Sequence, residues 1–114
     1  MASQSEHWPR INTDPNVESK PLHVLITGAA GQIGYHLTFL LSHGVVFGPH
    51  QTIVLHLFDI AVEALRGVAM ELEDSCFPLV KGIIVSDKPE DVFQDIEVAI
   101  LVAGMPRKLG MERK

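Results

Sequence analysis

Three glycines at regular spacing could bind phosphate. Gly28, Gly31 and Gly34 lie three residues apart in TGAAGQIGYHLTFLL, residues 27–41, between an apolar run and a segment of helical spacing. Glycine costs about 1 kcal/mol against alanine inside a helix, so its repeated use needs a reason. Between a strand and a helix, the first glycine permits a sharp turn, the second lets the backbone approach a pyrophosphate, and the third lets the helix pack closely. The helix N-terminus then faces the anion.

The spacing G-x-x-G-x-x-G is a variant of G-x-G-x-x-G and lacks the Gly-Lys-Ser/Thr ending of a P-loop. It predicts dinucleotide binding, with an ordinary glycine-rich turn as the alternative.

Asp59 is the second candidate, because it follows the next apolar run, 25 residues after Gly34. A carboxylate there can accept hydrogen bonds from both hydroxyls of an adenosine ribose and would repel a 2′-phosphate. The next cation along the chain is Arg66, so the sequence favours NAD over NADP. The alternative is a solvated aspartate that caps the helix expected to begin near Ala61, and both roles can hold together.

Two arginines in AGMPRKLGMERK, residues 103–114, are the third candidate. Arg107 and Arg113 follow the last apolar run, which should end beside the glycine turn at the switch point of a parallel sheet. Planar guanidinium groups bind carboxylates through two parallel hydrogen bonds, which lysine cannot do. The pattern favours a clamp for a small dianion, with a solvated basic rim as the alternative.

The elements that must position these residues alternate along the chain. Strands are predicted at 22–27, 52–58, 82–86 and 97–104, helices at 32–43 and 61–76, and a short helical turn at 89–95. This alternation predicts an α/β fold with crossover helices. Right-handed crossovers give four strands in the order 3-2-1-4, an incomplete doubly wound (Rossmann) parallel sheet. The expected inward faces of the two helices are Ile33, Leu37, Leu40 and Leu41, and Ala61, Leu65, Val68 and Leu72, with Gly44 at the first C-terminus.

Composition excludes several other classes of protein. The 114 residues are 46% hydrophobic and 20% charged, which is typical of one soluble globular domain. The net charge of -5 without a basic run argues against nucleic acid as a partner, and no apolar run is long enough for a membrane span. The single cysteine, Cys76, excludes an internal disulfide and fits a reducing compartment. No metal site is expected.

Residues 1–21, which include Trp8, are interpreted as a flexible N-terminal tail without a targeting signal, and residues 22–114 as a truncated NAD-binding domain.

Several stretches together resemble a known family. GAAGQIG, LFDI, GVAMELED, FPL and AILVAGMPRKLGMERK are similar to the cytosolic type of NAD-dependent malate dehydrogenase, from about His23 to Lys114. The resemblance implies a cytoplasmic, homodimeric enzyme that interconverts L-malate and oxaloacetate by hydride transfer, with the helix of GVAMELED in the dimer interface. It also implies that Arg107 pairs with the distal carboxylate and that Arg113 polarises the reacting carbonyl. The implied NAD-binding residues are Gly28, Ala29, Ala30, Gly31, Gln32, Ile33, Gly34, Asp59 and Gly104.

The chain departs from this family in its length. The family is much longer, and its proton-transferring histidine and partner aspartate lie beyond residue 114. None of the six histidines matches that position, so all are interpreted as structural or solvated, and no catalytic residue is expected here. The chain ends in a loop after MERK, which favours a truncated product or a fragment that is inactive alone. Two alternatives remain, an extended short-chain dehydrogenase/epimerase, whose motif also reads T-G-x-x-G-x-x-G, and a non-enzymatic nucleotide-binding remnant.

Overall fold

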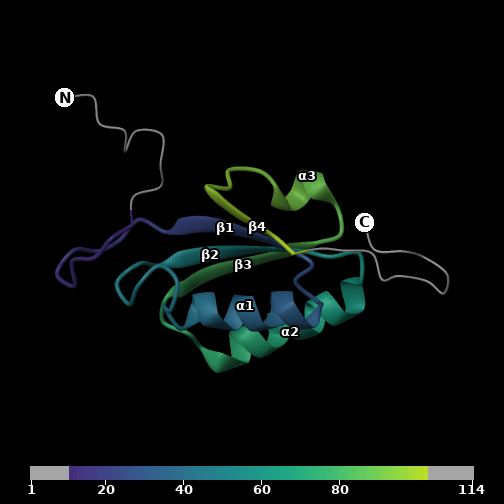
Figure 1. Ribbon diagram of the computed structural model, residues 1–114, viewed down its shortest axis with the longest axis horizontal. Helices are drawn as coiled ribbons and strands as arrows, with labels where there is room; N and C mark the ends of the chain where they lie inside the picture. The colour runs from purple at the N-terminus through teal and green to yellow at the C-terminus, as the bar shows by residue number, and fades with distance from the viewer. Residues whose placement is uncertain (1–10, 103–114) are drawn as a thin grey trace.

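Four parallel strands form one sheet in the structure, a computed structural model that describes residues 11–102. The strands are β1 (Leu22–Thr27), β2 (Ile53–Phe58), β3 (Val80–Ser86) and β4 (Val98–Leu101). They are ordered β3-β2-β1-β4 and every pair is parallel, as Figure 1 shows. The predicted fold class and strand order are therefore confirmed.

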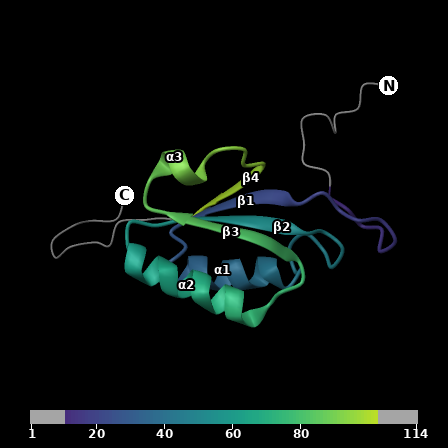
Figure 2. The same ribbon diagram turned by 180° about the vertical axis from the view of Figure 1, so that it is seen from behind.

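Three helices connect the strands. They are α1 (Gln32–Ser42), α2 (Val62–Ser75) and the short α3 (Pro89–Val92). The two long helices lie side by side on one face of the sheet, whereas α3 lies on the other face (Figures 1 and 2). The carboxyl ends of β1 and β2 lead directly into the segments before α1 and α2, so those two segments meet at one edge of the sheet.

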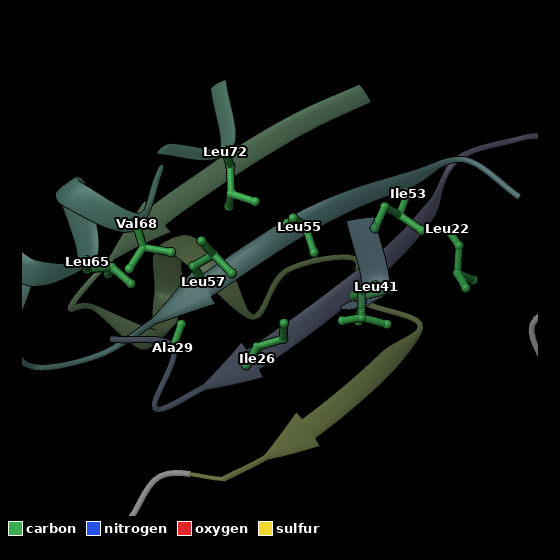
Figure 3. Close-up of a cluster of buried hydrophobic side chains, with 11 residues drawn as sticks. Leu22, Ile26, Ala29, Leu41, Ile53, Leu55, Leu57, Leu65, Val68 and Leu72 are labelled. Atoms are coloured by element: carbon green, nitrogen blue, oxygen red, sulfur yellow. The ribbon is translucent and has the colours of Figure 1, made fainter. Parts of the chain in front are cut away.

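The hydrophobic core lies between the sheet and the two long helices (Figure 3). Alternate residues of β1 and β2 point into it, because successive side chains of a strand face opposite sides. The other face is also partly buried, since Leu25 is 1% exposed and His56 is 3% exposed. Burial of both faces explains why these strands are almost continuously apolar. The core side chains drawn with labels in Figure 3 are Leu22, Ile26, Ala29, Leu41, Ile53, Leu55, Leu57, Leu65, Val68 and Leu72.

The predicted inward face of α1 is partly wrong. Leu41 is buried as expected, but Ile33 is 68% exposed, and the buried residues are Gly34, Thr38, Leu41 and Ser42. The hydroxyls of Thr38 and Ser42 can be buried because each donates to a carbonyl one turn earlier, at 2.7 and 2.8 Å. Gly34 brings this face of α1 against the start of the turn, so small residues occupy the contact and Ile33 points outward.

The inward face of α2 is largely confirmed. Leu65, Val68 and Leu72 are buried, but Ala61 is exposed because it is the N-cap, and Ala69 joins the buried set instead. Gly44 follows α1 with φ of +83°, and the N–H groups of Gly44 and Val45 donate to Leu41 and Leu40. These two bonds form a Schellman motif, which confirms the predicted C-terminal glycine.

Residues 11–21 hold no helix or strand, yet they bond to the segment before β2. The Asn12 N–H donates to Gln51 Oε1 at 2.8 Å, and Gln51 Nε2 donates to the carbonyls of Lys20 and Thr52 at 3.0 and 2.7 Å. Gln51 is only 1% exposed. The division of the chain at residue 21 stays a prediction, and Trp8 lies outside the described residues.

Residues 11–102 lack two features that would point to other kinds of function. None of their helices has the length and apolar character that crossing a membrane requires. No group of three or more His, Cys, Asp or Glu side chains in the same range could hold a metal ion.

Candidate dinucleotide site

The glycine turn is tied to the end of β2. The N–H groups of Gly28 and Ala29 donate to the carbonyl of Phe58 at 2.9 and 3.3 Å, and the Gly31 N–H donates to the Gly28 carbonyl at 3.0 Å. Gly28 has φ of +74°, a left-handed conformation that glycine adopts without the steric cost of a side chain. The first glycine therefore makes the sharp turn predicted for it.

Gly34 is required by packing. A Cβ at this position would lie 2.1 Å from the Gly28 carbonyl oxygen and 2.8 Å from Ala29 Cα. Both atoms belong to the backbone, so no side-chain rotation can make room. The third glycine thus allows α1 to contact the turn that precedes it, as its predicted role requires.

Gly31 is different, because packing within the chain does not demand glycine there. A Cβ would meet only the Gly28 carbonyl oxygen, at an ordinary 3.4 Å. Gly31 is the exposed N-cap of α1, no side chain caps this end, and the first turn carries no acid. An α-helix leaves its first N–H groups without intrahelical partners, and the helix dipole makes that end positive. The site can therefore receive an anion.

Asp59 joins the turn to the start of α2. Its Oδ2 accepts from the Ala30 N–H and its Oδ1 accepts from the Ala61 N–H, each at 3.0 Å. The capping alternative is therefore partly correct, since Asp59 holds the N-cap residue of α2. A carboxylate offers about four lone-pair sites, so two remain for ribose hydroxyls. The two roles considered for Asp59 are compatible in this geometry.

The last described strand ends at the same edge. Leu101 is paired with Thr27, and the Val102 N–H donates to the Thr27 carbonyl at 3.4 Å. The chain therefore leaves β4 beside the glycine turn. Gly104, Arg107 and Arg113 lie outside the described residues.

Sequence reasoning missed the backbone partners that shape the site. The carbonyl of Phe58 and the N–H of Ala30 are backbone groups, which no residue type marks in the sequence. Their partners become evident only once the pairing of the strands is known. A shallow hollow of about 360 Å³ borders the site on α1 and is lined by Gln32, Ile33, His36 and Leu37. A larger hollow of about 590 Å³ lies at the opposite end of the strands, near Ile11 and Gln51. It is remote from the turn and from Asp59, so we do not assign the dinucleotide to it.

The histidines of the described chain fall into two groups. His36 and His43 are exposed on or just after α1, and His50 is half-buried in a loop. His23 and His56 instead form a hydrogen bond with each other, in which His23 Nδ1 lies 2.8 Å from His56 Nε2. His7 lies outside the described residues.

A glycine turn, a helix N-terminus and an acid after the second strand of a 3-2-1-4 sheet define the doubly wound dinucleotide-binding class of domain. The chain belongs to the lactate/malate dehydrogenase family, because the model of its NAD binding domain matches residues 22–114.

Individual relatives agree with this assignment. The cytoplasmic malate dehydrogenase of Bos taurus is 53% identical over 98 residues, which are 84% of this chain and 29% of the bovine protein. Among solved structures, the malate dehydrogenase of Naegleria fowleri has a TM-score of 0.78 at 40% identity, covering 83% of this chain and 30% of that one. The lactate dehydrogenase of Trichomonas vaginalis in complex with NADH and oxamate has a TM-score of 0.73 at 46% identity, covering 79% of this chain and 28% of that one. The chain thus spans under a third of the length of these relatives.

Proposed function

We propose that this chain is the NAD-binding part of an enzyme that interconverts L-malate and oxaloacetate by hydride transfer. The observation that carries the proposal is the uncapped N-terminus of α1 beside the Asp59 carboxylate, within a domain of the lactate/malate dehydrogenase family. NAD would supply the hydride acceptor in malate oxidation. The relatives named cytoplasmic malate dehydrogenase support the malate assignment and a cytoplasmic location.

The described residues would bind the dinucleotide in two places. The backbone of Gly28–Gly34, which includes Ala29, Ala30, Gln32 and Ile33, would surround the pyrophosphate at the positive end of α1. Asp59 would accept hydrogen bonds from the adenosine ribose through its remaining lone pairs. Because a second negative charge would face this carboxylate, a 2′-phosphate would be repelled. Gly104 would also contact the dinucleotide, which rests on the resemblance alone.

The substrate would be bound by the segment after β4. Arg107 would pair with the distal carboxylate of the dicarboxylate substrate, and Arg113 would polarise its reacting carbonyl. These two roles rest on the family resemblance and on the exit of β4 beside the turn. The chain holds no histidine that matches the family's general base, so we expect the 114-residue chain to bind NAD without oxidising malate.

We also propose that the enzyme is a homodimer through α2. Met70 is 63% exposed on this helix, although its neighbours Val68, Ala69 and Leu72 are buried. Single exposed apolar side chains are common on protein surfaces, so the dimer proposal rests on the family resemblance. Sedimentation of a chain extended to full family length would test this, with a monomer at micromolar concentration as the contrary result.

A chimaera tests the substrate assignment. Residues 22–114 replace the matching part of the bovine cytoplasmic malate dehydrogenase, and kcat/KM is measured for oxaloacetate and for pyruvate. Arg107→Gln should lower the oxaloacetate value by about tenfold to a hundredfold, because a charged hydrogen bond to a carboxylate is lost. It should leave kcat/KM for pyruvate unchanged or raise it, whereas Arg113→Gln should lower kcat/KM for both keto acids.

Lys108→Gln is the matched control. It removes one positive charge next to Arg107, but lysine cannot bind a carboxylate through two parallel hydrogen bonds. It should leave the ratio of the two kcat/KM values unchanged. If Arg107→Gln lowered both substrates equally, Arg107 would position the loop only, and the malate assignment would lose its main support. If the chimaera folded but reduced neither keto acid with NADH, the proposed activity itself would be wrong.

A further inference from the structure

Two histidines and one backbone carbonyl form a continuous hydrogen-bonded chain on the α3 face of the sheet. His23 Nδ1 of β1 lies 2.8 Å from His56 Nε2 of β2, and the two ring centroids are 5.1 Å apart. His56 Nδ1 lies 2.8 Å from the carbonyl oxygen of Val92, the last residue of α3. His56 is 3% exposed and Val92 is fully buried. The chain therefore joins two central strands to the short helix.

The acceptors fix where the protons lie. The Val92 carbonyl can only accept, so His56 Nδ1 carries a hydrogen, and in the neutral ring Nε2 is then the acceptor. His23 Nδ1 must donate to it, which leaves the lone pair of His23 on Nε2. Burial is the main reason that the pKa of His56 lies below its ordinary value; the nearby His23 adds to this, while the Val92 carbonyl and Asp95 oppose it.

We propose that His23 and His56 form a clamp that keeps α3 on the sheet. The clamp holds when both rings are neutral or when one ring is charged, and it releases α3 when both rings are charged. A first proton can enter at His23 Nε2 and leaves both hydrogen bonds in place. A second proton must go to His56 Nε2, which already accepts the His23 hydrogen. Two N–H groups would then face each other across 2.8 Å, and two like charges would share a partly buried site.

The surrounding charges are too few and too exposed to compensate for two positive rings. Neither β1 nor β2 carries another titratable side chain, and β3 carries Lys81. Asp95 and Glu97 precede β4 and are exposed; Glu97 Oε1 accepts from the His23 backbone N–H. The remaining charged residues of α3 and its N-cap are Lys88, Glu90 and Asp91, all exposed.

Helix α3 depends on such contacts because it has only four residues. A helix this short does not persist alone, since nucleation outweighs its few internal bonds. The contacts on the sheet are the buried Val92 side chain, the Phe58 and Phe93 rings at 5.7 Å, and the His56–Val92 bond. The Ser86 hydroxyl also donates to Asp91 Oδ2 at 2.8 Å. Burial holds the pKa of His56 below its ordinary value of about 6.5 while α3 is attached, so attachment of α3 should weaken as pH falls below that ordinary value.

Hydrogen exchange measured by mass spectrometry tests the clamp in the 114-residue chain. After correction for intrinsic rates, peptide 89–93 should exchange about tenfold or more faster at about pH 5 than at about pH 7.5, relative to peptide 22–27. His23→Gln should reduce this acceleration, because an amide can either donate to His56 Nε2 or accept from it, whereas burial of His56 still opposes its charge. His36→Gln, which changes an exposed histidine of α1, should leave the acceleration intact.

Two results would overturn the proposal: no acid-induced acceleration in the wild-type chain, or equal acceleration in His23→Gln. If His23→Gln fails to fold, exchange of the imidazole C2 hydrogens in the wild-type chain decides instead. His56 should then remain largely neutral at about pH 6.5, where an unperturbed histidine is half charged. Half-charged His56 at that pH, with α3 still protected, would contradict the clamp.

Discussion

Replacement of Gly34 by alanine tests the contact that holds α1 against the glycine turn. The new Cβ would lie 2.1 Å from the Gly28 carbonyl oxygen and 2.8 Å from Ala29 Cα. The turn and the helix must therefore separate by about 1 Å before the contact becomes tolerable, and overpacking of this kind costs about 1–3 kcal/mol. Both contacted atoms are backbone, so the upper part of the range applies. Alanine returns about 1 kcal/mol of helix propensity, which leaves a net loss of about 1–2 kcal/mol.

Gly67→Ala is the matched control, because Gly67 also lies inside a helix. Apart from its chain neighbours and the backbone of its own helix, no atom would come within 4 Å of a Cβ at this position, so only helix propensity should change. We expect the free energy of unfolding to rise by about 0.5–1 kcal/mol. Urea denaturation followed by circular dichroism, at one protein concentration, compares the two variants directly. Isothermal titration with NAD should show about tenfold weaker binding for Gly34→Ala, because the N–H groups at the start of α1 have moved, and no change for Gly67→Ala.

The two substitutions must therefore change the free energy of unfolding in opposite directions. If Gly34→Ala stabilised the chain as Gly67→Ala does, the close contact between α1 and the turn would not exist. If Gly34→Ala lost stability but kept full NAD affinity, the turn would be a packing device and not the phosphate site.

Three other substitutions have defined outcomes. Asp59→Ser should narrow the preference for NAD over NADP in titrations of both dinucleotides, because the carboxylate that opposes a 2′-phosphate is removed; equal affinities in the unmutated chain would contradict the cofactor assignment. Leu101→Lys should reduce self-association in sedimentation runs, because Leu101 is 72% exposed on β4, whose outer edge pairs with no strand among residues 11–102; a wild-type chain that is monomeric at tens of micromolar would refute this. Gln51→Leu should lower the free energy of unfolding by about 1–3 kcal/mol, because the Asn12 N–H and the Lys20 carbonyl lose their partner, whereas the Thr52 carbonyl still accepts from the Leu22 N–H; an unchanged urea midpoint would show that these bonds add nothing.

Local chemistry made most of the fold and the glycine turn predictable. Gly28 needs a left-handed backbone and Gly44 ends α1 in a Schellman motif, and both requirements depend on the residue itself and a few neighbours. The strands are apolar over nearly their full length because both faces of the sheet are covered or partly covered. The position of Asp59 after β2 predicts its place in the site, because the parallel strand order brings that end of β2 beside the turn.

Features that depend on the approach of distant elements could not be predicted in the same way. Ile33 fits a helical apolar stripe, but the contact at Gly34 sets the rotation of α1 and turns Ile33 outward. The His23–His56 bond depends on the register that pairs Leu25 with His56, and no local pattern fixes that register. The roles of Arg107 and Arg113 rest on the family resemblance and stay predictions.

The NAD footprint on the 114-residue chain tests the central claim most directly. Hydrogen exchange is compared with and without saturating NAD, with peptides that separate the glycine turn, the Asp59 region and residues 11–21. Pyrophosphate at the N-terminus of α1 and ribose at Asp59 predict slower exchange in residues 28–35 and 59–62, and no change in residues 11–21. NAD binding that left both regions unchanged, or that protected residues 11–21 at the opposite end of the strands, would contradict the proposed site.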